Sequence, residues 1–474
     1  MSARPFLLAG EPARSDAVHA VRAPWDDRPV AEVCVAGPEH LERAIAAAAG
    51  AARGLARTPA AERAAILERM KDLVRARADE LVEATVHEAG KPVSLARLEV
   101  TRALDTLTDA AWAARALTGT VEPLDAVSSG AGRLGVVRRV PVGPVGAITP
   151  FNFPVNLVLH KLAPAIAAGC PIVLKPSPET PTPALLLGEM LVEAGAPPGA
   201  VSVLPLAVEH AGPLVDDPRL RLLTFTGSAK VGWDLRARAR GRRVILELGG
   251  NASNLVCADA DLDAAVPKLA VGGLAYAGQS CISVQNVLVD RARYAELVER
   301  LTAYARDVVR TGDPADPAVL CGPVIRAADA DRINRQITDA VRGGARALLG
   351  GERSGNLIAP TLLVDLPDGC AVVEGEVFGP VINVTPFDTI DEAFARVNAS
   401  RFGLQASIFT RDLATALRAH AELEVGAVVH DEASAFRVDC MPYGGVKESG
   451  LGREGPRHAV LEHTEPRMLV LRAG

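Results

Sequence analysis

Three residues of this chain have sequence neighbours that favour a chemically reactive or hydrogen-bonding role for the side chain. Cys281 lies in Gly278-Gln279-Ser280-Cys281-Ile282-Ser283, where small and polar residues leave a thiol accessible, as a reactive thiolate requires. Glu247 follows a short apolar run and precedes Gly249-Gly250, a position typical of groups that emerge at the end of a buried strand. Asn152 stands between two phenylalanines and two prolines, so a rigid turn would hold its amide as a fixed hydrogen-bond donor.

Each of these residues also has an ordinary structural interpretation. Most of the seven scattered cysteines should be buried free thiols, because none is spaced as a zinc or disulfide motif; no metal site is expected. Glu247 alone could be a surface acid, and Asn152 could form an Asx turn. A fourth candidate is Phe225-Thr226-Gly227-Ser228, a strand entering a helix, which could bind a phosphate at the helix N-terminus or simply cap it with Ser228.

The elements that would position these residues alternate between strand and helix. Apolar strands are expected at 147–148, 171–174, 201–204, 220–225 and 244–248, and helices at 155–168, 184–194 and from Ser228. A second series has a helix at 264–277, a strand at 284–289 and a helix at 293–309. The alternation predicts parallel, doubly wound sheets with ligands at the carboxyl ends of the strands.

Three further strands are expected at 361–364, 381–384 and 427–430, and a last one at 467–472. A strand so near the end of the chain needs a partner, which would be either the strand at 136–140 or another subunit.

Composition excludes several classes of protein. The 474 residues are 49% hydrophobic and 23% charged, which is incompatible with a disordered chain. With 51 Lys+Arg against 57 Asp+Glu, the net charge is -6, so a basic nucleic-acid surface is not expected. The longest apolar run, 162–174, is short and interrupted by prolines, and the first residues do not resemble a secretory signal. We therefore expect a cytoplasmic enzyme that binds neither nucleic acid nor membrane.

Several motifs occur in an order that is specific as a set. They are Pro150-Phe151-Asn152-Phe153-Pro154, Leu174-Lys175-Pro176-Ser177, Phe225-Thr226-Gly227-Ser228, Glu247-Leu248-Gly249-Gly250, Gly278-Gln279-Ser280-Cys281, Glu376-Val377-Phe378-Gly379-Pro380 and Pro442-Tyr443-Gly444-Gly445. The set resembles the NAD(P)-dependent aldehyde dehydrogenase superfamily over nearly the whole chain. The segment 434–442 is similar to the branch of lactaldehyde, phosphonoacetaldehyde and non-phosphorylating glyceraldehyde-3-phosphate dehydrogenases.

The resemblance implies roles for the catalytic residues. Cys281 would be the nucleophile, Glu247 the general base, and Asn152 would complete an oxyanion hole with the Cys281 backbone N–H. The aldehyde would become a thiohemiacetal and then a thioester, which a glutamate-activated water would hydrolyse to the acid. Two alternatives stay open: a dehydrogenase that passes the acyl group to coenzyme A, and a catalytically silent binding or structural protein. The presence of Glu247 favours hydrolysis.

The resemblance also implies a cofactor site. Lys175 and Glu376 would hold the riboses of NAD(P)+, Ser228 the pyrophosphate, and Phe378 would pack by the nicotinamide. The remaining expected cofactor contacts are Thr149, Pro150, Phe151, Ser177, Pro178, Phe225, Gly227 and Leu248. NAD and NADP are both compatible, because Pro178 stands where many NAD-preferring relatives carry a glutamate that repels a 2′-phosphate.

The expected substrate is a small, polar, anionic aldehyde, because two arginines match anion-binding positions of the branch. They are Arg102, in Glu99-Val100-Thr101-Arg102, and Arg437; His160 could be a third donor, with Ser280 and Ser283 nearby. The alternative is that the arginines are ion-paired with residues such as Asp105 and Asp439, and that His160 is structural. Ser280 stands where the glyceraldehyde-3-phosphate enzymes have an arginine.

The implied fold is α/β, aldehyde dehydrogenase-like, with three parts. A Rossmann-type cofactor domain would comprise 1–120 and 142–249, an α/β catalytic domain 250–445, and a small β oligomerisation element 121–141 and 459–474. A homodimer or homotetramer is expected from that element.

Overall fold

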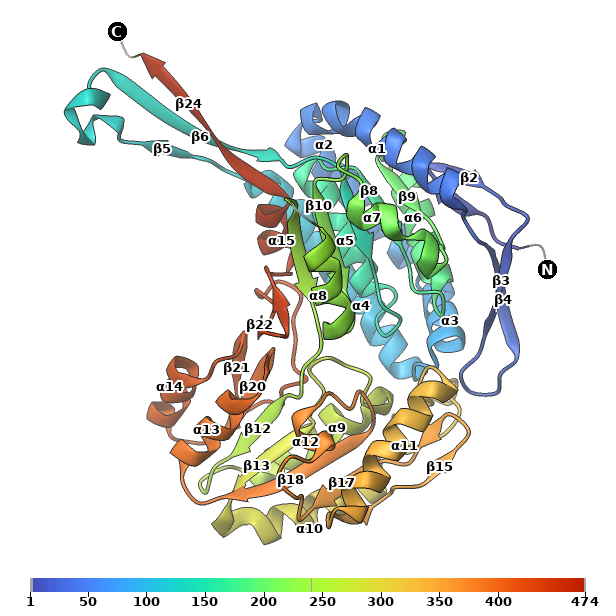
Figure 1. The fold of residues 1–474 in the computed structure, drawn as a ribbon, viewed down its shortest axis with the longest axis vertical. Helices are drawn as coiled ribbons and strands as arrows, with labels where there is room; N and C mark the ends of the chain where they lie inside the picture. The colour runs from blue at the N-terminus through green and yellow to red at the C-terminus, as the bar shows by residue number, and fades with distance from the viewer. Residues whose placement is uncertain (1–2, 240, 473–474) are drawn as a thin grey trace.

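The computed structural model describes residues 3–239 and 241–472, which form two lobes and a projecting arm (Figure 1). The first lobe is built on a sheet with the order β2-β1-β9-β8-β7-β10-β11-β23. Its strands are β1 (Phe6–Leu8), β2 (Glu11–Ala13), β7 (Val145–Ile148), β8 (Ile172–Lys175), β9 (Val201–Val203), β10 (Leu222–Thr226), β11 (Arg243–Glu247) and β23 (Gly450–Leu451). The five neighbouring strands β9, β8, β7, β10 and β11 run parallel, as the alternation of apolar strands and helices predicted.

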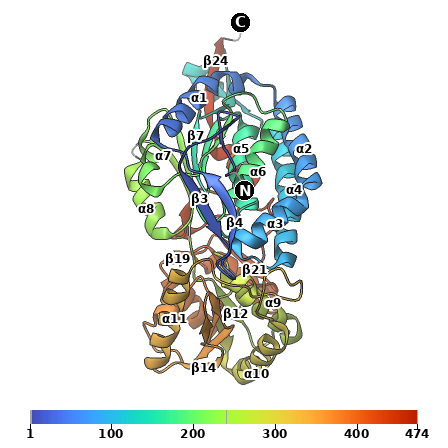
Figure 2. The same ribbon diagram turned by 90° about the vertical axis from the view of Figure 1, so that its right-hand side faces the viewer.

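Helices cover both faces of this sheet (Figure 2). They are α1 (Pro38–Arg57), α2 (Ala60–Ala76), α3 (Ala78–Ala89), α4 (Val93–Ala116), α5 (Asn156–Ala168), α6 (Pro181–Glu193), α7 (Gly212–Asp216), α8 (Ala229–Arg238) and α15 (Pro456–Glu462). Helix α5 is buried on every side, because it packs against α2, α4 and α15 as well as the sheet. One short 3-10 helix, η3 (Val208–His210), precedes α7.

The second lobe has a seven-stranded sheet with the order β14-β17-β18-β13-β12-β20-β21, parallel except for β14. Its strands are β12 (Ser253–Val256), β13 (Asn286–Asp290), β14 (Arg346–Leu349), β17 (Thr361–Val364), β18 (Val381–Phe387), β20 (Gln405–Phe409) and β21 (Ala427–His430). Its helices are α9 (Leu262–Leu274), η4 (Ala275–Gly278), α10 (Arg291–Val308), α11 (Ala327–Arg342), α12 (Ala371–Glu374), α13 (Ile390–Ala399) and α14 (Leu413–Glu422). Two small ribbons pair β15 (Arg353–Ser354) with β16 (Leu357–Ile358), and β19 (Phe402–Gly403) with β22 (Val446–Lys447).

The arm is a three-stranded antiparallel sheet with the order β24-β6-β5. Its strands are β5 (Thr120–Glu122), β6 (Arg133–Pro141) and β24 (Thr464–Arg472), with the short helices η1 (Leu124–Ala126) and η2 (Ser128–Gly130) at its tip. The last strand therefore pairs with the strand around Val136, the first of the two predicted partners.

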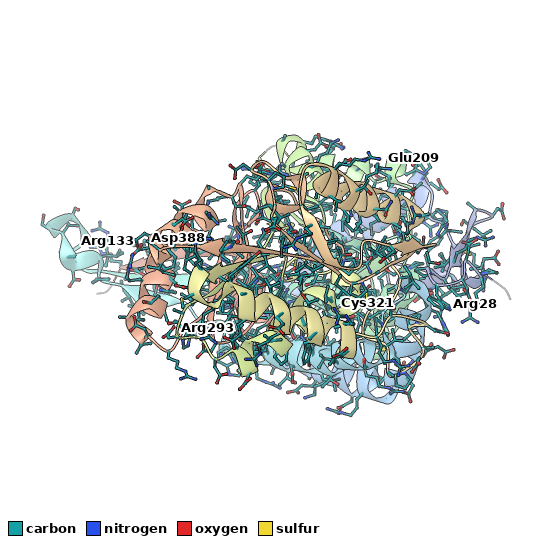
Figure 3. The ribbon with its side chains drawn as sticks, turned by 90° about the horizontal axis from the view of Figure 1, so that it is seen from below. Arg28, Arg133, Glu209, Arg293, Cys321 and Asp388 are labelled. Atoms are coloured by element: carbon teal, nitrogen blue, oxygen red, sulfur yellow. The ribbon has the colours of Figure 1, made fainter. Side chains whose placement is uncertain are left out.

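A hairpin of β3 (Val18–Arg22) and β4 (Pro29–Cys34) lies on the other side of the molecule. From below, Arg133 of the arm and Arg28 of the hairpin mark these two opposite sides (Figure 3). Within the described ranges, no helix is long and apolar enough to cross a membrane.

Candidate active site

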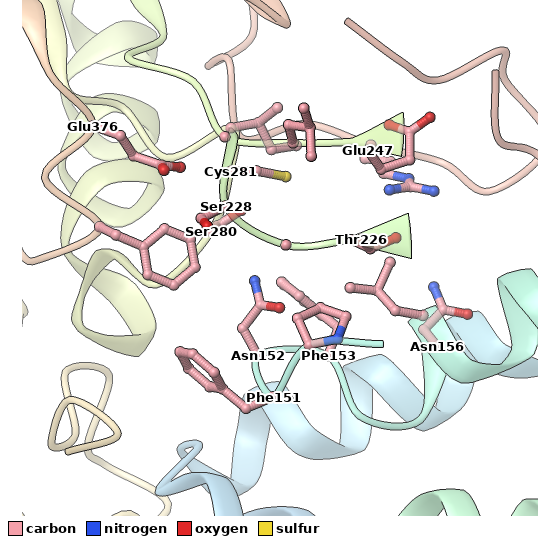
Figure 4. A pocket seen from close by; sticks show the side chains of 18 of the residues that line it. Phe151, Asn152, Phe153, Asn156, Thr226, Ser228, Glu247, Ser280, Cys281 and Glu376 are labelled. Atoms are coloured by element: carbon pink, nitrogen blue, oxygen red, sulfur yellow. The ribbon is translucent and has the colours of Figure 1, made fainter. Parts of the chain in front are cut away.

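A cavity of about 270 Å³ lies between the two lobes, beyond the carboxyl ends of β7, β10 and β11. The order of the parallel strands reverses between β7 and β10, and doubly wound sheets bind ligands at such a point. Many of the residues predicted from the sequence line it: Arg102, Pro150, Phe151, Asn152, Gly227, Ser228, Glu247, Leu248, Ser280, Cys281, Glu376, Phe378 and Arg437. The three proposed catalytic side chains thus share one cavity (Figure 4).

Cys281 follows a strained turn. Helix α9 ends at Leu274, three residues earlier than the predicted end at Ala277, because Tyr276 and Ala277 adopt left-handed φ angles of 54° and 52°. Gly278 continues the turn with φ 65°, and a Cβ there would collide with the Gly379 carbonyl oxygen. Left-handed backbone is costly for residues other than glycine and is often found where a functional group must be presented.

The Cys281 sulfur lies 2.8 Å from the Tyr443 hydroxyl. The Arg437 guanidinium stacks on the Tyr443 ring, 3.7 Å from its centroid. Burial raises the pKa of the Cys281 thiol to about 11, although the Tyr443 hydrogen bond and the Arg437 charge both act to lower it. The resting enzyme therefore holds a protonated thiol beside a hydroxyl group and a cation that favour its ionised form.

Asn152 is held in place by the nucleophile loop. Its Nδ2 donates to the Gln279 carbonyl oxygen at 3.0 Å, which leaves the second N–H of the amide for another acceptor. The Gln279 side chain is fixed in turn, since its Oε1 accepts from the Ile325 N–H at 2.9 Å. The Cys281 backbone N–H donates to none of the described residues. Two donors are thus available beside the sulfur.

A buried ion pair supports both of these loops. Lys91 pairs with Glu99, and its Nζ lies 3.7 Å from the ring centroid of Phe153 and 4.6 Å from that of Tyr276. Glu99 also accepts from the backbone N–H groups of residues 155 and 156 at 2.9 Å each, at the positive end of α5. The pair therefore joins the turn that carries Asn152 to the turn that precedes the nucleophile.

Glu247 ends β11 and is only 3% exposed. Neither carboxylate oxygen has a hydrogen-bond partner among the described residues. Burial, followed by the charge of Glu454, raises the pKa of Glu247 well above its ordinary value of 4.5. A carboxyl group in this state can hold or accept a proton near neutral pH, which is the property that a general base needs.

Glu454 joins two buried cations next to Glu247. One carboxylate oxygen lies 2.5 Å from Lys161 Nζ, and the other accepts from Arg437 at 3.2 Å. Burial alone would raise the pKa of Glu454, but the nearby positive charges, that of Lys161 first, hold it below its usual range. Glu454 is therefore ionised while its neighbour Glu247 is protonated.

Arg102 and Arg437 meet at Asp439. Arg102 binds the Asp439 carboxylate with two hydrogen bonds of 3.0 and 2.8 Å, and Arg437 Nε lies 3.9 Å from it. Asp439 also contacts the Asn156 amide and His160 Nε2, each at 2.9 Å. Of the predicted alternatives, the ion pair with Asp439 is present, and Asp105 takes no part in it among the described contacts. Both arginines nevertheless line the cavity.

The residues present fit a nicotinamide dinucleotide. The Glu376 carboxylate accepts only one hydrogen bond within the described chain, from Gly250 N–H at 3.2 Å, so it can accept more from hydroxyl groups. Burial raises the pKa of Glu376 to about 7. Ser228 caps α8, whose N-terminus offers free N–H groups to a phosphate. Phe378 packs edge to face against Phe151, with ring centroids 6.0 Å apart, and supplies a flat apolar wall.

Seven predicted site residues do not border this cavity: Thr149, His160, Lys175, Ser177, Pro178, Phe225 and Ser283. His160 is buried, and its Nε2 lies 3.2 Å from the Arg437 guanidinium, which favours a structural role for the ring. The Ser283 hydroxyl donates to the carbonyl oxygens of Gly272 and Gly273. Lys175 donates to the Pro176 carbonyl at 3.4 Å and has no acidic partner among the described residues. Lys175 ends β8 and Ser177 follows it, next to β7 in the sheet, where an extended cofactor would pass.

Sequence reasoning assigned no role to Tyr443, Glu454, Lys161 or Lys91, and it named Asp439 only as a possible ion-pair partner of the arginines. Lys161 could have been noticed as the one lysine in an otherwise apolar helix, since buried charges need partners. Tyr443 was part of a recognised motif, but only the structure places its hydroxyl against the sulfur.

A family model for the aldehyde dehydrogenase family matches residues 12–469. The chain is 41% identical over 448 residues to the 3-sulfolactaldehyde dehydrogenase of Priestia megaterium, covering 94% of this chain and 93% of that protein. The structure of aldehyde dehydrogenase 21 from Physcomitrella patens, in complex with the reaction product succinate, is 39% identical with a TM-score of 0.98, over 100% and 99% of the two chains. The structure of NADP-dependent glyceraldehyde-3-phosphate dehydrogenase from Bacillus halodurans, complexed with NADP, is 33% identical with a TM-score of 0.96, over 100% of both chains.

The fold and cavity define a two-lobed α/β oxidoreductase. The chain belongs to the aldehyde dehydrogenase family and is an NAD(P)-dependent enzyme of that family. The family and branch predicted from the sequence are confirmed.

Proposed function

We propose that this enzyme oxidises small anionic aldehydes to carboxylic acids through a thioester on Cys281. The observation that carries the proposal is the composition of one cavity. A thiol, an amide donor and a buried carboxyl group with no hydrogen-bond partner among the described residues line it together with Arg102 and Arg437. The first three groups supply the chemistry, and the arginines supply the recognition of a negative charge.

The reaction begins when the Cys281 thiol releases its proton to solvent and the thiolate adds to the aldehyde carbon, opening the C=O double bond and forming a thiohemiacetal. Negative charge develops on the former carbonyl oxygen, where the free N–H of the Asn152 amide and the Cys281 backbone N–H stabilise it. Loss of one such donor commonly costs about 3 kcal/mol of transition-state stabilisation, or on the order of a hundredfold in rate. The Tyr443 hydroxyl, 2.8 Å from the sulfur, donates to the thiolate.

Lys175 and Glu376 would hold the cofactor riboses, Ser228 the pyrophosphate, and Phe378 the nicotinamide ring. NAD(P)+ held there would supply the hydride acceptor that oxidises the thiohemiacetal to a thioester on Cys281. Pro178 leaves room for either NAD or NADP, since the adjacent Glu179 carboxylate is already bonded to the Ser177 hydroxyl and to Arg326.

Glu247, once it has released its own proton to solvent, takes a proton from water. The hydroxide so formed attacks the thioester and releases the free acid and the Cys281 thiolate. Burial, followed by the charge of Glu454, raises the pKa of Glu247, so its ionised form is a stronger base than a solvated carboxylate. Hydrolysis distinguishes this proposal from acyl transfer to coenzyme A.

Two arginines and the relatives support an anionic substrate. Arg102 and Arg437 reach the cavity with guanidinium groups, which bind carboxylates and sulfonates through paired hydrogen bonds. The Priestia megaterium relative is named for 3-sulfolactaldehyde, and the Physcomitrella patens structure contains succinate. Both compounds carry an anionic group on a short carbon chain.

We also propose that the domains follow the boundaries predicted from the sequence, and that the arm joins two or four copies in the cytoplasm. Strand β24 lies at the edge of the arm and exposes Met468, Leu469, Val470 and Leu471. An exposed apolar edge strand is typical of a surface that pairs with another chain.

Cofactor reduction followed by absorbance tests the proposed function. Sulfoacetaldehyde, succinate semialdehyde and lactaldehyde are compared with propanal, with NAD and NADP in parallel, and with or without coenzyme A. We expect kcat/KM for the charged aldehydes to exceed that for propanal by about tenfold or more, as one charged hydrogen bond would give. The product should be the free acid with and without coenzyme A.

Arg102→Ala and Arg437→Ala should each lower kcat/KM for the charged aldehydes selectively. Arg97→Ala is the matched control, because Arg97 lies on the same helix as Arg102 and pairs with Asp79 at the surface. Equal kcat/KM for charged and neutral aldehydes, or an acyl-CoA product, would overturn the proposal.

A further inference from the structure

The arginine side of the cavity contains a continuous network of buried charges. It runs from Lys161 through Glu454 to Arg437, and from Arg437 through Asp439 to Arg102. The side chains of Lys161, Glu454 and Asp439 are at most 2% exposed, and that of Arg437 is 8% exposed. Solvent therefore screens these charges little, and their sum matters to any ion that enters.

Three cations and two carboxylates make up this network, so one positive charge is unbalanced. Asp439 neutralises Arg102 through two parallel hydrogen bonds, and Glu454 lies between Lys161 and Arg437. Arg437 Nε is buried without a hydrogen-bond partner among the described residues. The excess charge and an unused donor thus coincide at Arg437.

The other titratable groups nearby do not change this sum in the resting enzyme. Burial, and then the charge of Arg437, lowers the pKa of His160, so the ring is neutral at neutral pH. The raised pKa of Glu247 keeps it protonated, and Cys281 and Tyr443 are neutral for the same reason. Glu376 lies at the far end of the cavity from Asn156 (Figure 4).

Arg326, which precedes α11, and the α11 residues Asp329 and Arg332 line the cavity and are engaged in ion pairs, Arg326 also with Glu179 at 3.0 Å. Arg326 and Arg332 both bond Asp329, at 2.9 and 3.5 Å. Position 280, next to the nucleophile, is a serine, so no further cation is present beside the sulfur. Arg453 donates to the carbonyl oxygens of residues 445 and 452 and does not line the cavity.

Resting on the proposed preference for anions, we infer that Asp439 limits the substrate to monoanionic aldehydes, such as sulfonates and carboxylates. One negative charge neutralises the network. A dianionic phosphonate or phosphate ester would leave a net negative charge in a buried site, close to the carboxylates of Asp439 and Glu454. A further cation would be needed to balance that charge, and position 280 is a serine. Asp439 is thus a specificity-determining residue that acts by holding Arg102.

Sulfoacetaldehyde and phosphonoacetaldehyde test the inference in the unmodified enzyme. The two aldehydes have carbon chains of the same length. The sulfonate carries one negative charge throughout, whereas a phosphoryl group loses its second proton at about pH 6 and then carries two. Between about pH 5.5 and pH 8.5, we expect the kcat/KM ratio of sulfoacetaldehyde to phosphonoacetaldehyde to rise by about tenfold or more, as buried like charges repel. Propanal measured at each pH removes the effect of the enzyme's own titration.

Asp439→Asn provides the second arm, because it raises the network's charge by one with little change in shape. We expect the variant to lower the sulfoacetaldehyde to phosphonoacetaldehyde ratio at about pH 8.5 by about tenfold or more. Loss of structure alone would lower both rates and leave the ratio unchanged. Asp105→Asn is the matched control, since Asp105 is exposed on the same helix as Arg102.

The outcomes separate the two proposals. If neither anion is preferred to propanal at any pH, the proposed function fails. If both anions are preferred and their ratio is the same at both pH values, or unchanged in Asp439→Asn, the anionic preference stands and the inference about charge is overturned.

Discussion

Replacing Tyr443 with phenylalanine removes the hydroxyl that lies 2.8 Å from the Cys281 sulfur and keeps the ring on which Arg437 stacks. A hydrogen bond to a charged group contributes about 1.5–3 kcal/mol, and the lower end applies to a sulfur acceptor. Since about 1.4 kcal/mol corresponds to tenfold in an equilibrium constant, the thiolate fraction should fall about tenfold at a fixed pH. The pKa of Cys281, already raised by burial, should rise further.

The assay is the rate of Cys281 alkylation by iodoacetamide as a function of pH, together with kcat/KM for an anionic aldehyde. We expect Tyr443→Phe to alkylate about tenfold more slowly near pH 8. Tyr276→Phe is the matched control, because the Tyr276 hydroxyl is also buried and has no hydrogen-bond partner among the described residues. Alkylation of Tyr443→Phe at the normal rate across the pH range would refute the reasoning.

Three further predictions follow from the same site. Asn152→Ala should lower kcat about 100- to 1,000-fold in steady-state assays, because it removes an oxyanion donor. Glu247→Gln should abolish hydrolysis and raise Tm near pH 8. The pKa of Glu247 is higher in the folded protein than its unfolded value of 4.5, so the contribution of Glu247 to stability falls as pH rises above 4.5. If Glu247→Gln and the unmodified enzyme have the same Tm near pH 8 as well as near pH 4, the stability prediction is contradicted. Lys91→Met should lower the free energy of unfolding by about 3–5 kcal/mol in urea, because Glu99 is left buried and unpaired. Adding Glu99→Gln to it should recover part of that loss.

The strand and helix order could be predicted because apolar runs and turn residues are local signals. The strands at 361–364 and 427–430 have the predicted bounds. The helix before the nucleophile was predicted to continue to Ala277, since nothing in Tyr276 and Ala277 indicates left-handed backbone. The contacts that accompany this conformation come from residues distant in sequence: the Leu320 carbonyl oxygen accepts from the Tyr276 N–H at 2.7 Å, and the Phe153 ring packs against the Tyr276 ring.

Many of the residues that line the cavity, such as Cys281 and Glu247, were predicted from the sequence. Others, such as Asn156 and Glu454, were not, and neither was the charge network. Arg102 and Asp439 are 337 residues apart, and Lys161 and Glu454 are 293 apart. Single-sequence patterns extend over a few turns of helix or a strand pair, so they cannot match such partners. For the same reason, the sequence identified His160 as a possible donor but not that Asp439 binds it.

Trapping the intermediate tests the central claim most directly. Glu247→Gln, incubated with cofactor and sulfoacetaldehyde or succinate semialdehyde and quenched in acid, should retain the acyl group as a thioester. Mass spectrometry of the digested protein should find that group on the peptide containing Cys281, only when both cofactor and aldehyde are present. An acyl group on another residue, or a fully unmodified Cys281 peptide after cofactor has been reduced, would contradict the account.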